Sequence, residues 1–383
     1  MELDREKRCD CAMVHENKKK VCMILPRHWK AFMGGAQYQA KCIAEGLNAT
    51  GRYSIYYVAK EVDREYKSDD CTIVQVTGSR YLRRAGLFTD GVELLTILRR
   101  IKPDIIYQRV ACAYTGIAAL YAKYSNCRMV WHIAHDDDVS KKWDIVRHYW
   151  DRRLIEYGIR NSDAIVAQTS QQSELLRANY NREVDAVVRN FHPVPTPPIK
   201  GKQATTVVWV ANLKPWKRPE LFVSLAKDLR DLQNVKFVMV GADLSKDKAN
   251  EIALRQSMAG CDNIEYLGGL GQEEVNQLLD RSDIFVNTSV EEGFANTFIQ
   301  SWMRKVPVIS LSVNPDNIFD DSMLGYFAGD YKTMVSRVRT LIVDRERREE
   351  MGNYAREYAI REHSPRNLES LLDVMDPVQA LGV

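Results

Sequence analysis

The sequence has no long apolar run and almost no net charge. None of its 383 residues lies in a stretch approaching the roughly 18 to 20 consecutive apolar residues that a membrane-spanning helix needs. Seven of the first ten residues are charged, which is not the pattern of a secretory signal peptide. These absences predict a cytoplasmic protein.

Metal-binding motifs are also scarce. Cys9, Cys11 and His15 lie close together, but no second Cys/His pair follows at the spacing of a zinc site. The eight cysteines are scattered, and several lie inside apolar segments, which is typical of reduced, buried thiols. We therefore expect residues 1–17 to form a flexible charged tail rather than a metal centre.

The small net charge of +3 is unevenly distributed. Residues 1–199 carry a net charge of +7, and the remaining residues carry −4. A basic first half predicts an anionic acceptor or a membrane surface on that side of the protein. Solvated surface charge with no partner would produce the same pattern.

Short apolar, β-branched runs alternate with helical patterns along the whole chain. Runs such as "VCMIL" and "DIIYQRV" are nearly continuous, as expected for parallel strands covered on both faces. The alternation stops at "FHPVPTPPIKGKQ", which has four prolines in six residues, and then restarts. We expect two doubly wound α/β domains facing each other across a cleft. The predicted parts are an N-terminal domain (18–192), a linker (193–204), a C-terminal domain (205–360) and a C-terminal helix (361–383) that can pack back on the first domain.

Two of the loops that follow strands carry glycines or cations. Gly34 and Gly35 precede a helical pattern, where backbone amides can approach a ligand, although a plain tight turn would look the same. The spacing is not G-x-G-x-x-G, which disfavours a dinucleotide site. Lys214, Lys217 and Arg218 lie between a strand and a helix, where they suit a diphosphate, unless the loop is simply solvated.

Two further loops carry carboxylates and a histidine. In "EEGFANTFIQ", Glu292 precedes a helix whose amides at 294–297 form an anion site, so its carboxylate suits neutral sugar hydroxyls better than phosphate. In "HIAHDDDVS", His135 follows a strand, where a neutral imidazole can bind substrate or be purely structural. The aspartates there allow a metal-binding D-x-D, but Asp138 also suits a helix cap.

In order and spacing, seven segments resemble the retaining family-4 glycosyltransferases of the GT-B fold. The segments are "GGAQYQ", "HIAHDDDV", "AQTSQQSELL", "RNFHP", "WVANLKPWKRPELF", "YLGG" and "EEGFANTFIQSWMRKVPVIS", and they extend over nearly the whole chain. The resemblance implies transfer of a sugar from a nucleotide-sugar to a hydroxyl of a saccharide or lipid-linked saccharide, in glycan or cell-surface polysaccharide biosynthesis. It implies no cofactor and no metal.

The resemblance also implies roles for individual residues. Glu292 and His135 correspond to donor-sugar contacts and Lys217 to a diphosphate contact, so these three are the expected catalytic residues. The expected donor-binding residues are Gly34, Gly35, Asn212, Arg218, Gly293, Phe294, Ala295, Asn296, Thr297 and Gln300.

This chain departs from the family pattern at two positions. Gln300 replaces a glutamate that binds the ribose, and an amide can still make that hydrogen bond at a cost of about 1 kcal/mol. Asn212 replaces an arginine that binds the diphosphate, which Lys214 or Arg218 can offset. We expect an active enzyme, and the alternatives are a sugar-nucleotide epimerase and a non-catalytic nucleotide-sugar-binding subunit.

The acceptor is expected to bind the more basic N-terminal domain, with peripheral contact to an anionic membrane at the inner face. The basic residues predicted for this role are Arg80, Arg83, Arg84 and Arg109.

Overall fold

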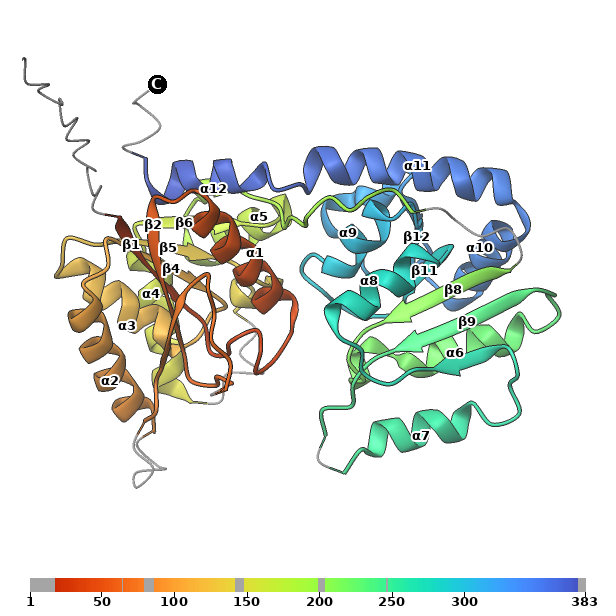
Figure 1. Ribbon diagram of the computed structural model, residues 1–383, viewed down its shortest axis with the longest axis horizontal. Coiled ribbons are helices and arrows are strands. Elements are labelled where there is room, and N and C mark those ends of the chain that lie inside the picture. Colours follow the sequence, from red (N-terminus) through yellow and green to blue (C-terminus); the bar gives the residue numbers. More distant parts are fainter. Residues whose placement is uncertain are drawn as a thin grey trace, which may run out of the picture.

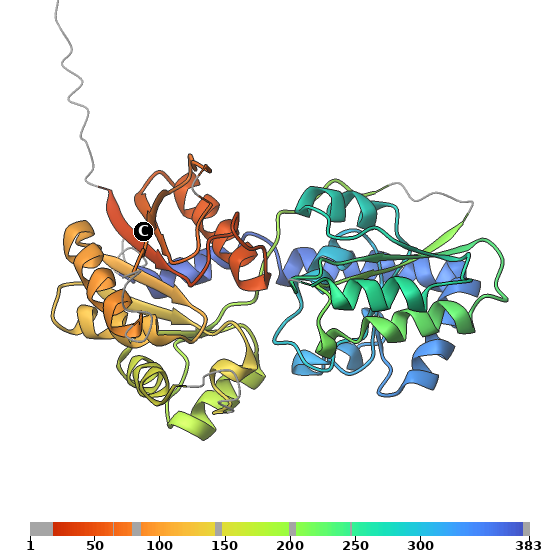
Figure 2. The ribbon, with the colours of Figure 1, turned by 90° about the horizontal axis from the view of Figure 1, so that it is seen from below.

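The computed structural model describes residues 18–63, 65–78, 86–141, 148–198, 204–245 and 247–377. Within these ranges the chain forms two separate parallel sheets, each with helices on both faces (Figures 1 and 2). The tail at 1–17 and its cysteines lie outside the described residues.

The first domain contains a sheet of seven described strands in the order β3-β2-β1-β4-β5-β6-β7, and every pairing is parallel. The strands are β1 (Lys19–Ile24), β2 (Tyr53–Ala59), β3 (Thr72–Gln75), β4 (Ile105–Arg109), β5 (Arg128–His132), β6 (Ala164–Ala167) and β7 (Ala186–Val187). The helices are α1 (Gly35–Ala49), α2 (Gly86–Ile101), α3 (Ala113–Lys123), α4 (Tyr149–Asn161) and α5 (Ser170–Tyr180), with a 3₁₀ turn η1 (Asp136–Asp138).

The second domain contains a sheet of six described strands in the order β10-β9-β8-β11-β12-β13, again all parallel. The strands are β8 (Thr205–Val210), β9 (Val235–Val240), β10 (Ile264–Tyr266), β11 (Ile284–Asn287), β12 (Val308–Ser310) and β13 (Gly325–Phe327). The helices are α6 (Pro219–Asp228), α7 (Ala249–Ser257), α8 (Gln272–Asp280), α9 (Asn296–Met303), α10 (Tyr331–Val343) and α11 (Arg345–Glu362), with 3₁₀ turns η2 (Pro215–Lys217) and η3 (Pro315–Asp320).

The strand order reverses once in each sheet, and this places the loops that matter most. In the first sheet the reversal lies between β1 and β4, and in the second it lies between β8 and β11. Ligands of open α/β sheets bind beyond the carboxyl ends of strands at such a reversal. The loops after β1, β8 and β11 are therefore the positions where a site is expected.

The chain crosses between the domains twice. It leaves the first domain after β7, and it returns through α11 to α12 (Asn367–Met375), which lies above the first sheet in Figure 1. Leu368, Leu371 and Met375 of α12 are buried in the same core as α1 and β1. His363, between the two helices, accepts a hydrogen bond from the His192 amide at its carbonyl, so the two crossings contact each other.

Most elements expected from the sequence patterns are present, with shifted ends. The runs "VCMIL" and "DIIYQRV" form β1 and β4, and the proline-rich segment lies between β7 and β8. The last strand of the first sheet, β7, is short, because its pairing with β6 is limited to Ala186 and Val187.

Candidate functional site

The starts of α1 and α9 meet where the two domains touch. Gly34 is the N-cap of α1, Ala295 is the N-cap of α9, and no side chain caps either terminus. A Cβ atom placed on Gly35 would lie 2.7 Å from Asn296 Nδ2, so a larger residue there would displace the Asn296 side chain. The glycine therefore allows the close approach of the two helix starts, whose positive ends lie in one region.

The side chain of Asn296 joins the domains at this point. Its Oδ1 accepts a hydrogen bond from Gln39 Nε2 at 2.8 Å and lies 3.2 Å from His192 Nε2. Burial, above all, lowers the pKa of His192 to about 3, so the ring is neutral and can donate from Nε2. The sequence did not predict that Gln39 and His192 would contact the second domain, because polar residues at these positions resemble ordinary residues of the first domain.

An ion pair lies at the carboxyl ends of β8 and β11. Lys217 Nζ is 2.8 Å from Glu292 Oε1, and both side chains are more than four-fifths buried. The same oxygen accepts hydrogen bonds from Ser289 Oγ at 2.7 Å and Asn287 Nδ2 at 3.0 Å. Ser289 and Asn287 therefore orient Glu292, a role that the sequence did not reveal.

Three donors on one oxygen leave the other, Oε2, with no hydrogen-bond partner among the described residues. Burial opposes ionisation of Glu292. The positive charge of Lys217 and the hydrogen bonds from Lys217, Ser289 and Asn287 nevertheless hold its pKa below the ordinary value. Glu292 is therefore an oriented carboxylate with one oxygen available to a ligand hydroxyl. The ammonium of Lys217 has three donors, so its pairing with Glu292 leaves donors for a second anion.

The neighbouring cations have different surroundings. Arg218 donates to the carbonyl oxygens of Thr288 and Ser289 and to Ser312 Oγ, at 2.8, 3.4 and 2.6 Å. Its backbone is left-handed (φ 47°), an unfavourable conformation for a residue with a side chain. Arg218 was expected to bind the donor, but here its guanidinium binds groups of its own domain. These acceptors are neutral, so they do not cancel its charge. The ammonium of Lys214 lies 4.8 Å from the Trp216 ring centre, and Asn212 is half-buried directly after β8.

The loop that carries His135 packs against the Glu292 loop from the opposite domain. A Cβ atom on Gly293 would lie 3.3 Å from the Ala134 carbonyl oxygen, the His135 Cα and Gln172 Nε2. Phe294, the next residue, is buried against His363. The structure thus brings together His135, Glu292 and Lys217, the three expected catalytic residues.

The aspartates beside His135 have structural partners. Asp138 accepts hydrogen bonds from the amides of Ala111, Ala134 and His135 at 2.8 to 3.1 Å. It therefore closes the start of its own 3₁₀ turn, η1, and does not cap the helix that follows, as the sequence had suggested. Asp136 accepts one from Gln172 Nε2 at 3.0 Å. Across the described ranges no group of three His, Cys, Asp or Glu side chains is placed to hold a metal ion.

His135 has two alternative partners on one nitrogen. Its Nδ1 lies 3.2 Å from the Asp137 backbone nitrogen, and a neutral ring accepts a hydrogen bond from that amide. The same Nδ1 lies 3.3 Å from Asp137 Oδ2, and a protonated ring donates a hydrogen bond to that oxygen. Burial lowers the pKa of His135, but the hydrogen bond and charge of Asp137, with Asp138 and Asp136, raise it above the ordinary value. The aspartates therefore favour the protonated form of the His135 imidazole more than water would.

Gln300 lies on α9 with its amide turned toward α8. Its Nε2 donates to Asn276 Oδ1 at 3.2 Å, and the side chain is only 4% exposed. Thr297, one turn earlier, lies in the first turn of the helix. A ribose hydroxyl would have to replace the Asn276 contact to reach the Gln300 amide.

The prediction that Arg109 contacts the acceptor is wrong for this structure. The side chain is 1% exposed and donates to Tyr107 Oη at 3.2 Å and Asn190 Oδ1 at 2.7 Å. It stabilises the carboxyl edge of the first sheet from within. The other arginines considered for the acceptor, at 80, 83 and 84, lie outside the described residues.

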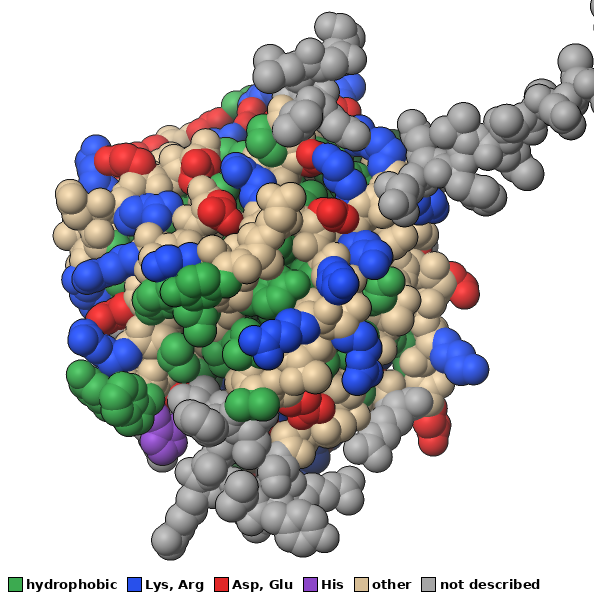
Figure 3. Space-filling view, turned by 90° about the vertical axis from the view of Figure 1, so that its left-hand side faces the viewer, with side chains coloured by type: hydrophobic (Ala, Val, Ile, Leu, Met, Phe, Trp, Pro, Cys, Tyr) green, Lys and Arg blue, Asp and Glu red, His purple; other side chains and the backbone are tan. Residues whose placement is uncertain are grey.

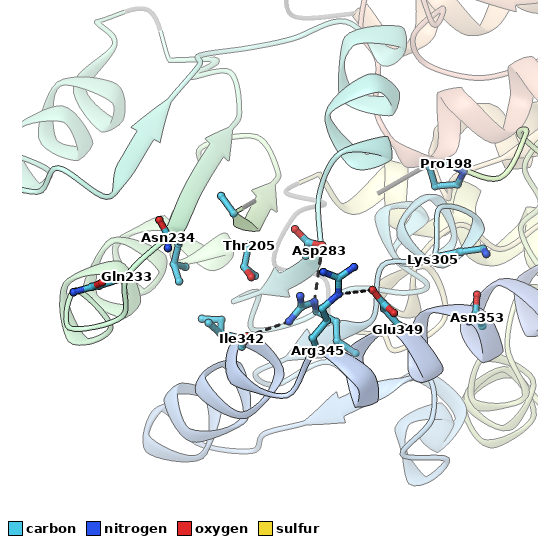
Figure 4. A pocket seen from close by; sticks show the side chains of 13 residues that line it. Pro198, Thr205, Gln233, Asn234, Asp283, Lys305, Ile342, Arg345, Glu349 and Asn353 are labelled. Atoms are coloured by element: carbon cyan, nitrogen blue, oxygen red, sulfur yellow. Dashed lines mark hydrogen bonds and ion pairs between the residues drawn. The ribbon is translucent and has the colours of Figure 1, made fainter. Parts of the chain in front are cut away.

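Two surface pockets lie away from these loops. One, of about 440 Å³, is lined by Thr205, Val235 and Asp283 at the amino ends of the second sheet and by Arg345 and Glu349 of α11 (Figure 4). The other, of about 650 Å³, lies between α2 and α3. Neither is at the carboxyl ends of strands, where a ligand of such sheets is expected.

Two all-parallel domains that meet at the carboxyl ends of their strands have the architecture of the GT-B enzymes. The chain belongs to the glycosyltransferases: residues 33–193 match the family model "Glycosyltransferase Family 4" and residues 196–358 match "Glycosyl transferases group 1". The expectations of fold, family and enzyme class are thereby confirmed.

One curated relative is a component of the human phosphatidylinositol N-acetylglucosaminyltransferase, which is 27% identical over 152 residues. That alignment covers 39% of this chain and 31% of the relative, so this chain spans about a third of its length. Sucrose-phosphate synthase from Thermosynechococcus elongatus superimposes with a TM-score of 0.77 and 13% identity, over 95% of this chain and 100% of that one. The HepE protein of Anabaena, in complex with UDP and glucose, gives a TM-score of 0.75 with 14% identity over 95% and 100%. At these identities the structural likeness establishes the fold alone.

The partners of His135 lead to a prediction about its titration. In an Asp137→Asn variant the charge that favours the imidazolium is gone while burial remains, so the His135 pKa should fall below its wild-type value. NMR titration of the imidazole protons measures this shift. Asp70→Asn is the control. It removes a carboxylate that is hydrogen-bonded to Asn48 rather than to His135, so the His135 pKa should stay unchanged. An equal pKa in the wild type and the Asp137 variant would contradict the assignment.

Proposed function

We propose that this protein transfers a sugar from a nucleotide-sugar to an acceptor hydroxyl with retention of anomeric configuration. The observation that carries the proposal is the oriented Lys217–Glu292 pair beside the starts of α1 and α9. The oxygen of Glu292 without a partner suits a hydroxyl of the donor sugar. The cation and the helix amides suit the diphosphate.

The diphosphate is proposed to lie beside the two adjoining helix starts. The amides of Asn296 and Thr297 begin α9, and those after Gly34 begin α1, so donors from both domains lie in one region. Lys217 adds a cation at the end of β8, and the uncancelled charge of Arg218 lies next to it. Together these groups stabilise the negative charge that forms on the departing nucleoside diphosphate.

The proposed reaction needs no protein nucleophile. The acceptor oxygen bonds to the anomeric carbon on the face from which the phosphate oxygen departs, and that phosphate oxygen takes the acceptor proton. The protein then contributes positioning and charge stabilisation. We propose that no metal takes part, since Lys217, Arg218 and the helix amides supply the positive charge.

A panel of UDP-, GDP- and ADP-sugars, each with and without saccharide acceptors, tests this function. UDP-glucose is the first donor to try, because the HepE protein of similar fold was solved with UDP and glucose. Nucleotide release that depends on acceptor, with an α-linked product from an α-linked donor, is the expected result. Sugar isomerisation without acceptor would identify an epimerase, and nucleotide binding with no turnover would identify a binding subunit.

Replacing Lys217 tests the diphosphate assignment. Lys217→Ala should lower turnover about 100-fold or more, the scale of losing a principal charge stabiliser in the transition state. Lys214→Ala is the matched control, since that ammonium lies over Trp216 and is expected to have a smaller effect. Steady-state kinetics with the active donor measures both variants. Wild-type turnover in Lys217→Ala would refute the assignment.

The acceptor is proposed to be saccharide or lipid-linked, with the N-terminal domain resting on an anionic membrane surface. No helix in the described ranges is long and apolar enough to span a bilayer. Figure 3 shows Lys and Arg side chains interleaved with hydrophobic ones on the end of this domain. Tyr124, directly after α3, and Tyr149 and Trp150, at the start of α4, are exposed aromatic residues, at 79%, 62% and 70% exposure. Lys123 and Arg153 lie over the rings of Tyr124 and Tyr149, a combination that suits lipid headgroups.

Vesicle binding tests this surface. A Tyr149→Ser, Trp150→Ser variant should bind vesicles of phosphatidylglycerol and phosphatidylcholine several-fold more weakly than the wild type, since its aromatic anchors are lost. Phe327→Ser, which removes an exposed aromatic residue of the other domain, is the control. Co-sedimentation measures the bound fraction. Equal binding by all three proteins would exclude this surface.

A further inference from the structure

A carboxylate of the second domain caps a helix of the first. Asp316, in η3, accepts hydrogen bonds from the backbone amides of Ser170 at 2.9 Å and Gln171 at 3.0 Å. These are the first two residues of α5, and Thr169 Oγ1 accepts the next amide, that of Gln172, at 3.1 Å. A charged acceptor at a helix N-terminus is favoured by both the free amides and the helix dipole.

The backbone at Asp316 is held in an unfavourable conformation. Asp316 and the following Asn317 both have left-handed backbones, with φ of 49° and 55°. Two consecutive residues with side chains in this region cost free energy that the surrounding contacts must supply. The two hydrogen bonds to α5 are contacts of this kind, and they exist only while the domains are together.

The capped helix is linked directly to the site. Gln172, in the first turn of α5, donates from Nε2 to Asp136 Oδ1, next to His135. Gln172 Nε2 and the His135 Cα also lie close to Gly293, the residue after Glu292, because a Cβ atom added to Gly293 would contact both. A displacement of α5 relative to η3 would therefore move the His135 loop away from the Glu292 loop.

We infer that Asp316 is a positioning residue that holds the two domains closed, with His135 facing Glu292 and Lys217, by capping α5 across the domain interface. This inference rests on the proposed transfer reaction for its kinetic consequence. Its structural consequence is independent of turnover. Asp316 itself contacts neither His135 nor Glu292, so it acts through α5.

Both sides of the contact can be altered separately. Asp316→Ala removes the acceptor. Ser170→Pro removes one donor, and proline is tolerated at this first helical position because its ring matches the helical φ. The preceding residue, Thr169, has an extended backbone (φ −137°, ψ 156°), as a residue before proline requires. Asp330→Ala is the matched control, since Asp330 caps α10 within one domain through the Thr333 amide at 2.9 Å.

Three measurements are made on each purified full-length variant: the radius of gyration by X-ray scattering, UDP affinity by calorimetry, and kcat and KM for the active donor. Asp316→Ala should enlarge the ligand-free protein and weaken UDP binding about tenfold, because only the closed fraction presents both helix starts. Ser170→Pro should change both in the same direction but less, because the Gln171 amide still donates to Asp316. KM should rise more than kcat falls, and Asp330→Ala should match the wild type. The double variant should resemble Asp316→Ala, because the bond that Ser170→Pro removes is one of the two that Asp316→Ala already removes.

The inference is overturned if Asp316→Ala equals Asp330→Ala in size and UDP affinity, or if the effects of the two substitutions simply add. Asp316→Asn, which keeps the shape and one neutral acceptor, should fall between the wild type and Asp316→Ala. If the alanine variant fails to fold, Asp316→Asn is compared with Asp330→Ala in its place, in size and in UDP affinity. A wild type that binds UDP but transfers no sugar would refute the proposed function while leaving the scattering and calorimetric comparison intact.

Discussion

The unpaired backbone amides at helix starts are the constraint that organises the contact between the two domains. The first amides of any helix have no partner within that helix, and they leave a partial positive charge. Three helices, α1, α5 and α9, begin where the domains meet. The protein supplies a carboxylate to α5 through Asp316, whereas no side chain of the described residues caps α1 or α9. Anionic groups at these two termini would satisfy the constraint, which supports the proposed diphosphate position.

The charges around Lys217 point in the same direction. The charges of Lys217 and Glu292 cancel each other, but the partners of Arg218 among the described residues are neutral acceptors. The pKa of Lys214 is lowered by burial and by the positive charges of Lys217 and Arg27. Arg27 belongs to the opposite domain. Burial is the larger cause, and the two cations add to it. Lys214, Lys217 and Arg218 thus supply positive charge in the loop that follows Asn212, where the resemblance implies an arginine.

The sequence predicted the elements well and their mutual contacts poorly. Parallel strands buried on both faces, such as β1 and β4, read as continuous apolar runs, and the prolines at 193–198 marked the crossing between domains. Glu292 and Lys217 were singled out because they follow strands, and the structure pairs them with each other. Asp316 could not be found, because "NPDN" reads as an ordinary turn and its partner amides lie almost 150 positions earlier in the chain. Arg109 was misjudged for a related reason: an arginine at a strand end is usually exposed, but here Tyr107 and Asn190 bind it inside the domain.

The substitution of a glutamine for a glutamate at 300 is consistent with the burial of this position. A carboxylate that is almost fully buried needs a positive partner, and the nearby Arg304, whose Nη1 donates to the Gln300 carbonyl, already pairs with Asp280 at 3.1 Å. The amide of Gln300 instead makes a neutral hydrogen bond to Asn276, which can be exchanged without moving a charge. A ribose presents hydroxyls that both donate and accept, and an amide offers both kinds of partner. Residue 300 can thus serve the proposed donor without the charge that the family carries there, provided that Asn276 finds a new partner when the ribose enters.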